Sequence, residues 1–138
     1  MERYKVRYLN DLRTEIEHIG NSSKITTDAP KDNQGLGRSF SPTDLVASSL
    51  GSCMLTIIGI SAKNNNINID SLAAEIDKEM SVNPPRMIKK INVILIIKGS
   101  FSQKQKIIIE RSAKHCPVHK SLNPNIDINL KFNFKSTV

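Results

Sequence analysis

The sequence is poor in aromatic side chains. Only 4% of its 138 residues are aromatic and none is tryptophan. The sequence therefore offers few side chains on which the bases of single-stranded RNA could stack. No zinc-finger or RNP-like pattern is present either. The formal net charge of +7 comes from basic residues that are dispersed along the chain. We therefore expect a solvated basic surface and no nucleic-acid partner.

The sequence also lacks a signal peptide, and its longest uncharged run is a poor membrane span. Residues 1–13 alternate and carry charges, where a signal peptide needs an apolar stretch of about 7–15 residues. The longest uncharged run, residues 45–62, is close to the minimum length of a membrane span, but serines and a threonine lower its hydrophobicity. The protein is therefore expected in the cytoplasm, without membrane contact.

Glycine-rich phosphate loops and common hydrolase motifs are missing as well. Gly35 and Gly37 lack the strand-to-helix context and the third glycine of a dinucleotide fingerprint, so we interpret them as loop glycines. The sequence contains no serine elbow and no H-E-x-x-H motif. We expect no cofactor.

What the sequence does contain is one long, uncharged helix. Ser41 is a candidate cap, Pro42 suits the first helical turn, and Asp44 stands where a capping box carries an acidic side chain. The pattern predicts a helix over residues 42–64 that ends at three asparagines. Several of its residues are small and would let another backbone approach closely: Ala47, Ser48, Gly51, Ser52 and Gly59. We expect this helix to be buried on nearly every face.

Around the helix the hydrophobic period changes to two, which is typical of strands. Three short strand candidates precede the helix and three longer segments follow it: residues 2–9, 13–19, 23–29, 67–80, 90–99 and 125–134. An apolar stripe with charged flanks predicts a second helix over residues 102–115. The length fits a single domain, 1–138. The predicted fold is α+β, in the order β-β-β-α-β-β-α-β.

The two cysteines are the main candidates for chemistry. In a reducing cytosol, cysteines serve redox or metal chemistry, or fill the core, more often than they form a permanent disulfide. Cys53 suits a small core position, but its small polar neighbours could also leave room for a peroxide or a second sulfur. It lies too far along the predicted helix for the N-terminal dipole to lower its pKa. A reactive thiolate there would need a nearby arginine.

The second cysteine, Cys116, precedes Pro117 and lies where a helix should stop. It too could be a core residue at a helix end. Together with His115, His119 and Cys53 it would offer four ligands for zinc. Because Cys53 has no companion ligand within its own helix turn, the spacing does not favour this metal site, and we expect no metal.

Several segments together resemble the OsmC-like family, which includes the organic hydroperoxide resistance proteins. They are LRTEIEH and SKITTDAP near the start, FSPTDLVASSLGSCMLTIIGISA in the predicted helix, and CPVHKSL near the end. The resemblance implies an intertwined homodimer, in which antiparallel sheets from both chains wrap around two long central helices. It places each active site at the subunit interface.

The resemblance also implies a function and its residues. It identifies a thiol-dependent peroxidase for organic hydroperoxides in oxidative-stress defence, in which Cys53 attacks the peroxide and Cys116 resolves the sulfenic acid to a disulfide. A small thiol or a lipoyl-type dithiol would then reduce the disulfide. An arginine of the N-terminal strands would pair with the thiolate, and Arg13 is the best match, with Arg38 second.

One position departs from the family pattern. Peroxidatic members carry a glutamate directly after the proline that opens the helix, where it holds the arginine, whereas this sequence has Thr43. The neighbouring Asp44 is better explained by the capping box. The arginine clamp would then be absent or built differently. This departure favours an alternative, a non-catalytic dimer that binds a small apolar or lipid-like molecule at its interface pocket.

Overall fold

The computed structural model describes residues 1–137, which form two compact units. The first unit is Met1–Val46 and the second begins at Ala47. Both helices and strands are present, which confirms the α+β class. The extent of a single domain, 1–138, stays a prediction.

The first unit is a three-stranded antiparallel sheet, as the N-terminal pattern predicts. Its strands are β1 (Tyr4–Tyr8), β2 (Arg13–His18) and β3 (Lys24–Asp28), followed by a short 3-10 helix, η1 (Lys31–Asn33). Alternation places apolar side chains on one face and charged ones on the other. The apolar face is largely exposed within one chain: Tyr4, Val6, Tyr8 and Ile25.

Helix α1 (Pro42–Asn64) has the predicted bounds. Its start is fixed by a reciprocal pair of hydrogen bonds, because Ser41 N–H donates to Asp44 Oδ2 at 2.8 Å and Asp44 N–H donates to Ser41 Oγ at 3.1 Å. This is the capping box expected from the sequence, and it satisfies backbone donors that the first helical turn leaves unpaired.

The second unit contains a sheet of three longer strands: β4 (Ser71–Met80), β5 (Ile88–Lys98) and β6 (Asp127–Lys135). Strands β4 and β5 are antiparallel, but β5 and β6 are parallel. The expectation of antiparallel sheets is therefore wrong for β6. A parallel partner requires a crossover, and helices α2 (Gln103–Lys114) and α3 (Pro117–Ser121) provide it. The sequence did not predict α3.

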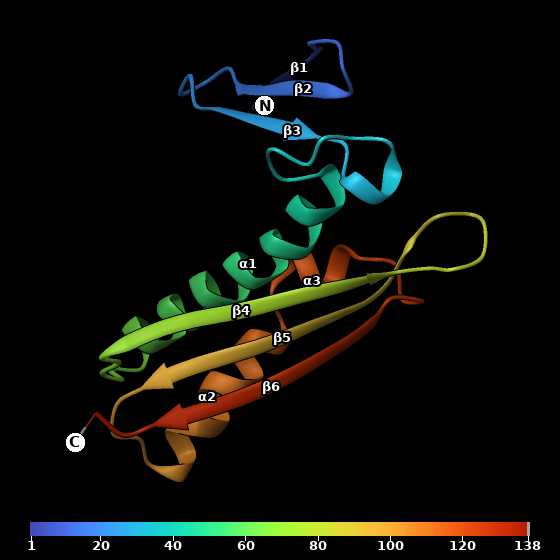
Figure 1. Ribbon diagram of the computed structural model, residues 1–138. Coiled ribbons are helices and arrows are strands. Elements are labelled where there is room, and N and C mark those ends of the chain that lie inside the picture. The colour runs from blue at the N-terminus through green and yellow to red at the C-terminus, as the bar shows by residue number, and fades with distance from the viewer. Residues whose placement is uncertain (138) are drawn as a thin grey trace. The chain divides into compact units, whose positions relative to one another are not determined.

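One face of this second sheet carries the core (Figure 1). Helices α1 and α2 both pack on it, and the alternate residues of β5 that face them are buried: Ile91, Val93, Leu95 and Ile97. Gly51 of α1 allows a close approach to β4, because a Cβ there would lie 2.3 Å from Cδ1 of Ile76. The helix is thus seated on the sheet through a position that only glycine fits without rearrangement.

Helix α1 is not buried on nearly every face, contrary to the prediction. Leu50, Met54 and Ile58 are fully buried, but Ile60 is 51% exposed. A stripe of mostly small residues lies exposed on the same side: Ser49, Ser52, Thr56, Gly59 and Ile60. The reason is that the described part of the second unit offers this helix packing on one side only. By length and composition α1 could cross a membrane, but a core helix passes the same test.

Candidate functional site

The second unit brings the two predicted cysteines together. Cys53 is half-buried on α1 and packs against the core, in which Cys116 is fully buried. A hydrogen bond between the two side chains is among the interactions that set the pKa of Cys116. Both residues are free thiols. The pair therefore has the contact that a dithiol–disulfide couple needs.

The position of Cys116 follows from its local sequence. Helix α2 ends at Lys114, and Pro117 occupies the first position of α3. This proline favours an extended conformation in the residue before it, and Cys116 has φ −67° and ψ 142°. The Cys116 sulfur accepts a hydrogen bond from the backbone N–H of His119 at 3.3 Å. Backbone geometry on both sides thus holds this thiol at the start of α3.

The surroundings of Cys116 favour its protonated form. Burial raises the pKa of the Cys116 thiol, and the hydrogen bond with Cys53 and the negative charge of Cys53 raise it further. The backbone N–H groups of His119 and Val118 act in the opposite direction but do not prevail. The raised pKa favours the protonated form of Cys116, which suits a second thiol that reacts only after the first.

The four residues considered for zinc do not gather into a site. Within residues 1–137, no group of three or more His, Cys, Asp or Glu side chains lies close enough to hold a metal ion. The His115 ring is engaged instead with its own helix, since Nδ1 lies 2.7 Å from the carbonyl oxygen of Arg111.

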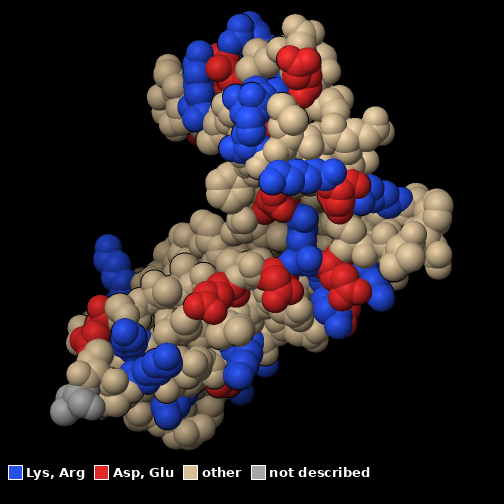
Figure 2. Space-filling model, viewed as in Figure 1, with Lys and Arg blue, Asp and Glu red and all other residues tan. Residues whose placement is uncertain are grey.

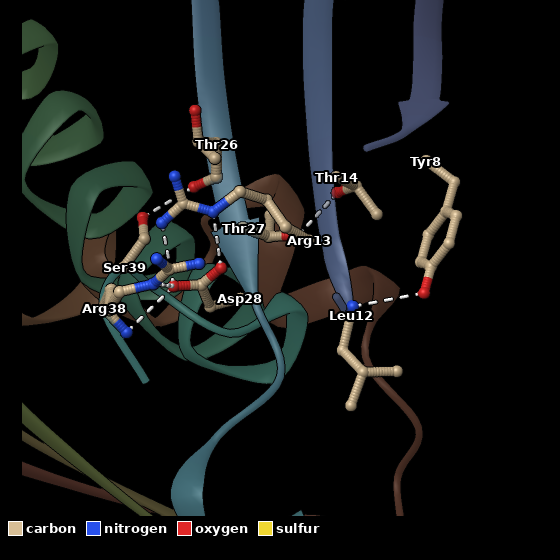
Figure 3. Close-up of polar contacts among 9 residues, drawn as sticks. All are labelled: Tyr8, Leu12, Arg13, Thr14, Thr26, Thr27, Asp28, Arg38 and Ser39. Carbon is tan, nitrogen blue, oxygen red and sulfur yellow. Dashed lines mark hydrogen bonds and ion pairs between the residues drawn. The ribbon is translucent and has the colours of Figure 1, made fainter. Parts of the chain in front are cut away.

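The first unit holds the predicted arginine, Arg13, in a bidentate ion pair (Figure 3). Arg13 on β2 lies directly opposite Asp28 on β3. Arg13 Nε donates to Asp28 Oδ1 at 2.7 Å, and Nη2 donates to Oδ2 at 3.0 Å. The Asp28 side chain is only 3% exposed, against 31% for Arg13. This fork is the geometry in which guanidinium and carboxylate bind most strongly.

The second candidate arginine, Arg38, shares the same carboxylate. Its backbone N–H donates to Asp28 Oδ2 at 2.9 Å, and its Nε lies 3.6 Å from that oxygen. The hydrogen bond from Arg13, supported by both positive charges, lowers the pKa of Asp28 to about 2. The same hydrogen bond raises the pKa of Arg13. Two guanidinium groups face one carboxylate, so the cluster keeps a net positive charge.

The backbone that leads into Arg13 is held in an uncommon conformation. Asn10, Asp11 and Leu12 all have left-handed φ values of 73°, 51° and 61°. Hydrogen bonds stabilise this turn, because Leu12 N–H donates to the Tyr8 hydroxyl at 3.1 Å and Ala29 N–H donates to the Leu12 carbonyl at 3.0 Å. Such strain persists only where its surroundings fix it. The start of β2 is therefore a defined support for Arg13.

Asp28 is the site residue that sequence reasoning missed. The hairpin between β2 and β3 was predicted, but only the register seen in the structure places the first residue of β2 opposite the last of β3. Thr43 contributes a hydroxyl that lies 3.2 Å from Ser41 Oγ, close to the helix cap. The interaction of Arg13 or Arg38 with the Cys53 thiolate stays a prediction.

Charge is distributed unequally between the units. The acidic and basic side chains of residues 1–46 balance, so the whole formal charge of +7 comes from the remaining residues. Figure 2 nevertheless shows both signs interspersed on the face it displays. On this face the positive charge is thus dispersed among acidic side chains.

Comparisons with known proteins agree on the family and the fold. The family described as OsmC-like protein matches residues 31–131. A crystal structure from Psychrobacter arcticus, named for an osmotic stress induced and detoxification response, is 42% identical, with a TM-score of 0.90 and 96% of each chain covered. No curated protein matches the sequence.

Two more distant structures share the fold. An OsmC-like protein from Mycoplasma pneumoniae is 23% identical, with a TM-score of 0.82, and covers 97% of this chain and 96% of its own. An organic hydroperoxide resistance protein, OsmC, from Legionella pneumophila is 16% identical, with a TM-score of 0.79 and 96% of each chain covered.

Proposed function

Because this chain belongs to the OsmC-like family, we propose that it is a thiol-dependent peroxidase that reduces organic hydroperoxides. The observation that carries the proposal is the contact between Cys53 and Cys116, which gives a half-buried thiol a buried, protonated neighbour. Fold relatives named organic hydroperoxide resistance proteins, from Legionella pneumophila and Elizabethkingia anophelis, support the substrate class.

The reaction has two steps on the protein. The Cys53 thiolate attacks the outer oxygen of the hydroperoxide, the O–O bond breaks, and the alkoxide takes a proton and leaves as an alcohol. The Cys116 sulfur then attacks the resulting sulfenic acid, giving its proton to the hydroxyl group that leaves as water. The product is a Cys53–Cys116 disulfide. A small thiol or lipoyl-type dithiol reduces it by exchange and is itself oxidised.

Arg13 has the role of stabilising the Cys53 thiolate. A cysteine in the middle of a helix gains little from the helix dipole, so it needs a cation to be reactive near neutral pH. The ion pair with Asp28 raises the pKa of Arg13 and so keeps it charged, and the Arg13 side chain is 31% exposed. Arg38 is the second candidate for this role.

The functional unit is a homodimer. Two exposed surfaces support this: the apolar face of the β1–β3 sheet and the stripe of small residues on α1. The stripe lets a second helix approach closely, and a second copy of the chain would cover both surfaces. The dimer acts in the reducing cytoplasm, where dithiols are available to regenerate it. It has no membrane or nucleic-acid partner.

The test is consumption of cumene hydroperoxide with a lipoyl-type dithiol as reductant. Cys53→Ser should abolish turnover, because it removes the nucleophile. Cys116→Ser should still reduce one equivalent of peroxide and leave a sulfenic acid, which a dimedone-type probe would trap. Unchanged turnover in Cys53→Ser would show that Cys53 is not the nucleophile and would contradict the proposed function.

A second function, a non-catalytic dimer that binds a lipid-like molecule, is favoured by one observation. Position 43 carries threonine instead of the acidic residue expected in peroxidatic members. If the wild-type protein consumed no hydroperoxide, native mass spectrometry should show a bound apolar ligand.

A further inference from the structure

The Cys116 sulfur makes a structural contact in addition to its contact with Cys53. Cys116 is the N-cap residue of α3, and its sulfur accepts a hydrogen bond from the backbone N–H of His119 at 3.3 Å. The Cys116 carbonyl oxygen accepts the next hydrogen bond, from the backbone N–H of Lys120 at 3.1 Å. The start of α3 is therefore held by the same residue that forms the proposed disulfide.

Helix α3 depends on this cap because it is short. It consists of five residues, Pro117–Ser121, all of which the structure describes, and none of them is buried. Val118 packs against the apolar core from the side, and so does Leu122, directly after the helix. A helix of this length is not stable by itself in water. Loss of the hydrogen bond at its start should therefore loosen it.

Cys53 lies on a much more firmly held element. Helix α1 has 23 residues, and Leu50 and Met54, on either side of Cys53 in the sequence, are fully buried. Gly51 seats the helix closely on β4. Because a packed core resists displacement and a helical side chain has few allowed rotamers, α1 cannot easily bring its sulfur closer to Cys116. The movement that closes two sulfurs from contact to a covalent bond therefore falls on Cys116.

The neighbouring helix α2 has a cap that is independent of the thiols. Gln105 N–H donates to Ser102 Oγ at 3.1 Å, and Ser102 N–H donates to Gln105 Oε1 at 2.9 Å. Serine is a preferred cap residue, whereas the sulfur of cysteine is a weak acceptor. Of these two caps in the second unit, only the one at α3 uses an atom that takes part in the proposed reaction.

We propose that α3 is a redox-linked helix, ordered while Cys53 and Cys116 are thiols and loosened when they form a disulfide. Oxidation joins the two sulfurs and transfers two protons and two electrons to the oxidant. It also draws the Cys116 sulfur away from the His119 N–H. Loosening of α3 then gives a reductant access to a sulfur that is fully buried in the dithiol form. The inference deepens the proposed function and rests on its disulfide.

The coupling between α3 and the thiols has to be reciprocal. If the disulfide loosens α3, then an ordered α3 must stabilise the dithiol against oxidation by the same factor. A protein that stabilises its reduced form is a stronger oxidant, because its disulfide is then more easily reduced. Interactions that hold α3 in place, such as the packing of Val118, should therefore affect the redox equilibrium of the pair.

The test is amide hydrogen exchange, measured by NMR on the full-length protein in two states. One sample is reduced with dithiothreitol, and the other is oxidised with diamide, which takes up the two hydrogens and does not require peroxidase turnover. The amides of His119 and Lys120 should exchange about fivefold or more faster in the oxidised protein, the effect that loss of a helix cap typically has. The Gln105 amide at the α2 cap is the internal control and should exchange equally in both states.

Variants at the two cysteines separate the cap from the disulfide. Cys53→Ser keeps the cap sulfur but cannot form the pair, so diamide should leave exchange in α3 unchanged. Cys116→Ala lacks the cap and should show fast exchange in α3 without any oxidant. Cys116→Ser should show slow exchange with or without diamide, because a serine hydroxyl can take over the cap.

A pair of matched substitutions tests the reciprocal effect. Val118→Ala weakens the packing of ordered α3, so it should shift the equilibrium with a dithiothreitol redox buffer toward the disulfide by about threefold or more. Ile107→Ala on α2, at a side chain that is 39% exposed, is the control and should leave the equilibrium unchanged.

The outcomes distinguish this inference from the proposed function. Equal exchange of the α3 amides in the two states of the wild type would overturn the inference, and this comparison needs no variant. Faster exchange that extends equally to Gln105 would also overturn it, because it would show a general loss of stability. If diamide failed to join Cys53 and Cys116, the inference and the disulfide step would both be wrong. A redox-dependent α3 in a protein that consumes no hydroperoxide would contradict the peroxidase alone.

Discussion

The two units of this protein bury different kinds of side chain. In the second unit the buried positions are aliphatic, with Cys116 among them, and they join α1, α2 and β5 in one cluster. In the first unit, the buried residues among those described are polar: Thr27, Asp28 and Ser41. One unit is therefore held by an apolar core and the other by hydrogen bonds and an ion pair.

The two thiols and the arginine of the proposed reaction are therefore held in place by different interactions. The thiols are placed by close packing, which excludes water and keeps Cys116 protonated. Arg13 is placed by a charged hydrogen-bond network that keeps it ionised. A three-stranded sheet with an uncovered apolar face has little stability of its own. The first unit therefore depends on a covering surface, which the proposed dimer supplies.

The largest predicted effect comes from making the same change, valine to alanine, once in each of the two sheets. Val93→Ala, at a position 1% exposed in the second sheet, should destabilise the protein by about 2 kcal/mol at any protein concentration. Val6 in the first sheet is 62% exposed, so Val6→Ala should cost less, and only through contact with the second copy. Urea unfolding at two concentrations measures both. Equal, concentration-independent losses would contradict the comparison.

The next effect concerns the exposed stripe of α1. A Cβ at Gly59 meets nothing within 4 Å, so Gly59→Leu should not disturb the single chain. If the stripe packs against a second helix, the added side chain should raise the dimer Kd by about tenfold or more. Sedimentation analysis measures this. Lys104→Leu on α2 is the control and should dimerise like the wild type, and an unchanged Kd for Gly59→Leu would argue against the helix contact.

A third effect separates the two thiols within the second unit. At pH 8 iodoacetamide should modify Cys53 at least about tenfold faster than Cys116, because burial and the neighbouring Cys53 raise the pKa of Cys116. Peptide mapping after short exposures measures both rates. Equal rates would show that Cys116 is not protected. Unfolding in urea should abolish the difference.

The smallest effect is the acid response of the first unit. The pKa of Asp28 is lowered from 3.8 to about 2, so its ion pair stabilises the fold fully above about pH 4. That stabilisation is lost as the pH falls toward 2, because the native carboxylate is then protonated. Thermal midpoints between pH 5 and 2 should fall less in Asp28→Asn than in the wild type. Asp11→Asn, at an exposed carboxylate, should keep the wild-type response.

Local signals allowed parts of this fold to be predicted from the sequence. The start of α1 depends on a capping box formed by residues a few positions apart. Ser41 and Asp44 form it, and both can be recognised in the sequence. The alternation of β4 likewise predicts which of its side chains face the core. The sequence itself singled out Cys53 and Cys116, the family resemblance implied their roles, and the structure brings the two residues together.

Features that depend on register or on long-range packing could not be predicted in the same way. The parallel pairing of β6 depends on the path of the crossover, which no strand pattern encodes. Asp28 became visible only once the β2–β3 register placed it opposite Arg13. The sequence of α1 is uncharged on every face, so it predicted burial all round. In a single chain, however, the helix packs against other elements on one side only.

The most direct test of the central claim is intact mass and free-thiol content before and after one equivalent of cumene hydroperoxide, followed by dithiothreitol. We expect both thiols to disappear and the mass to fall by two hydrogen atoms, since Cys53 and Cys116 form a disulfide, and we expect dithiothreitol to restore both thiols. Survival of both thiols in the presence of the peroxide would contradict it.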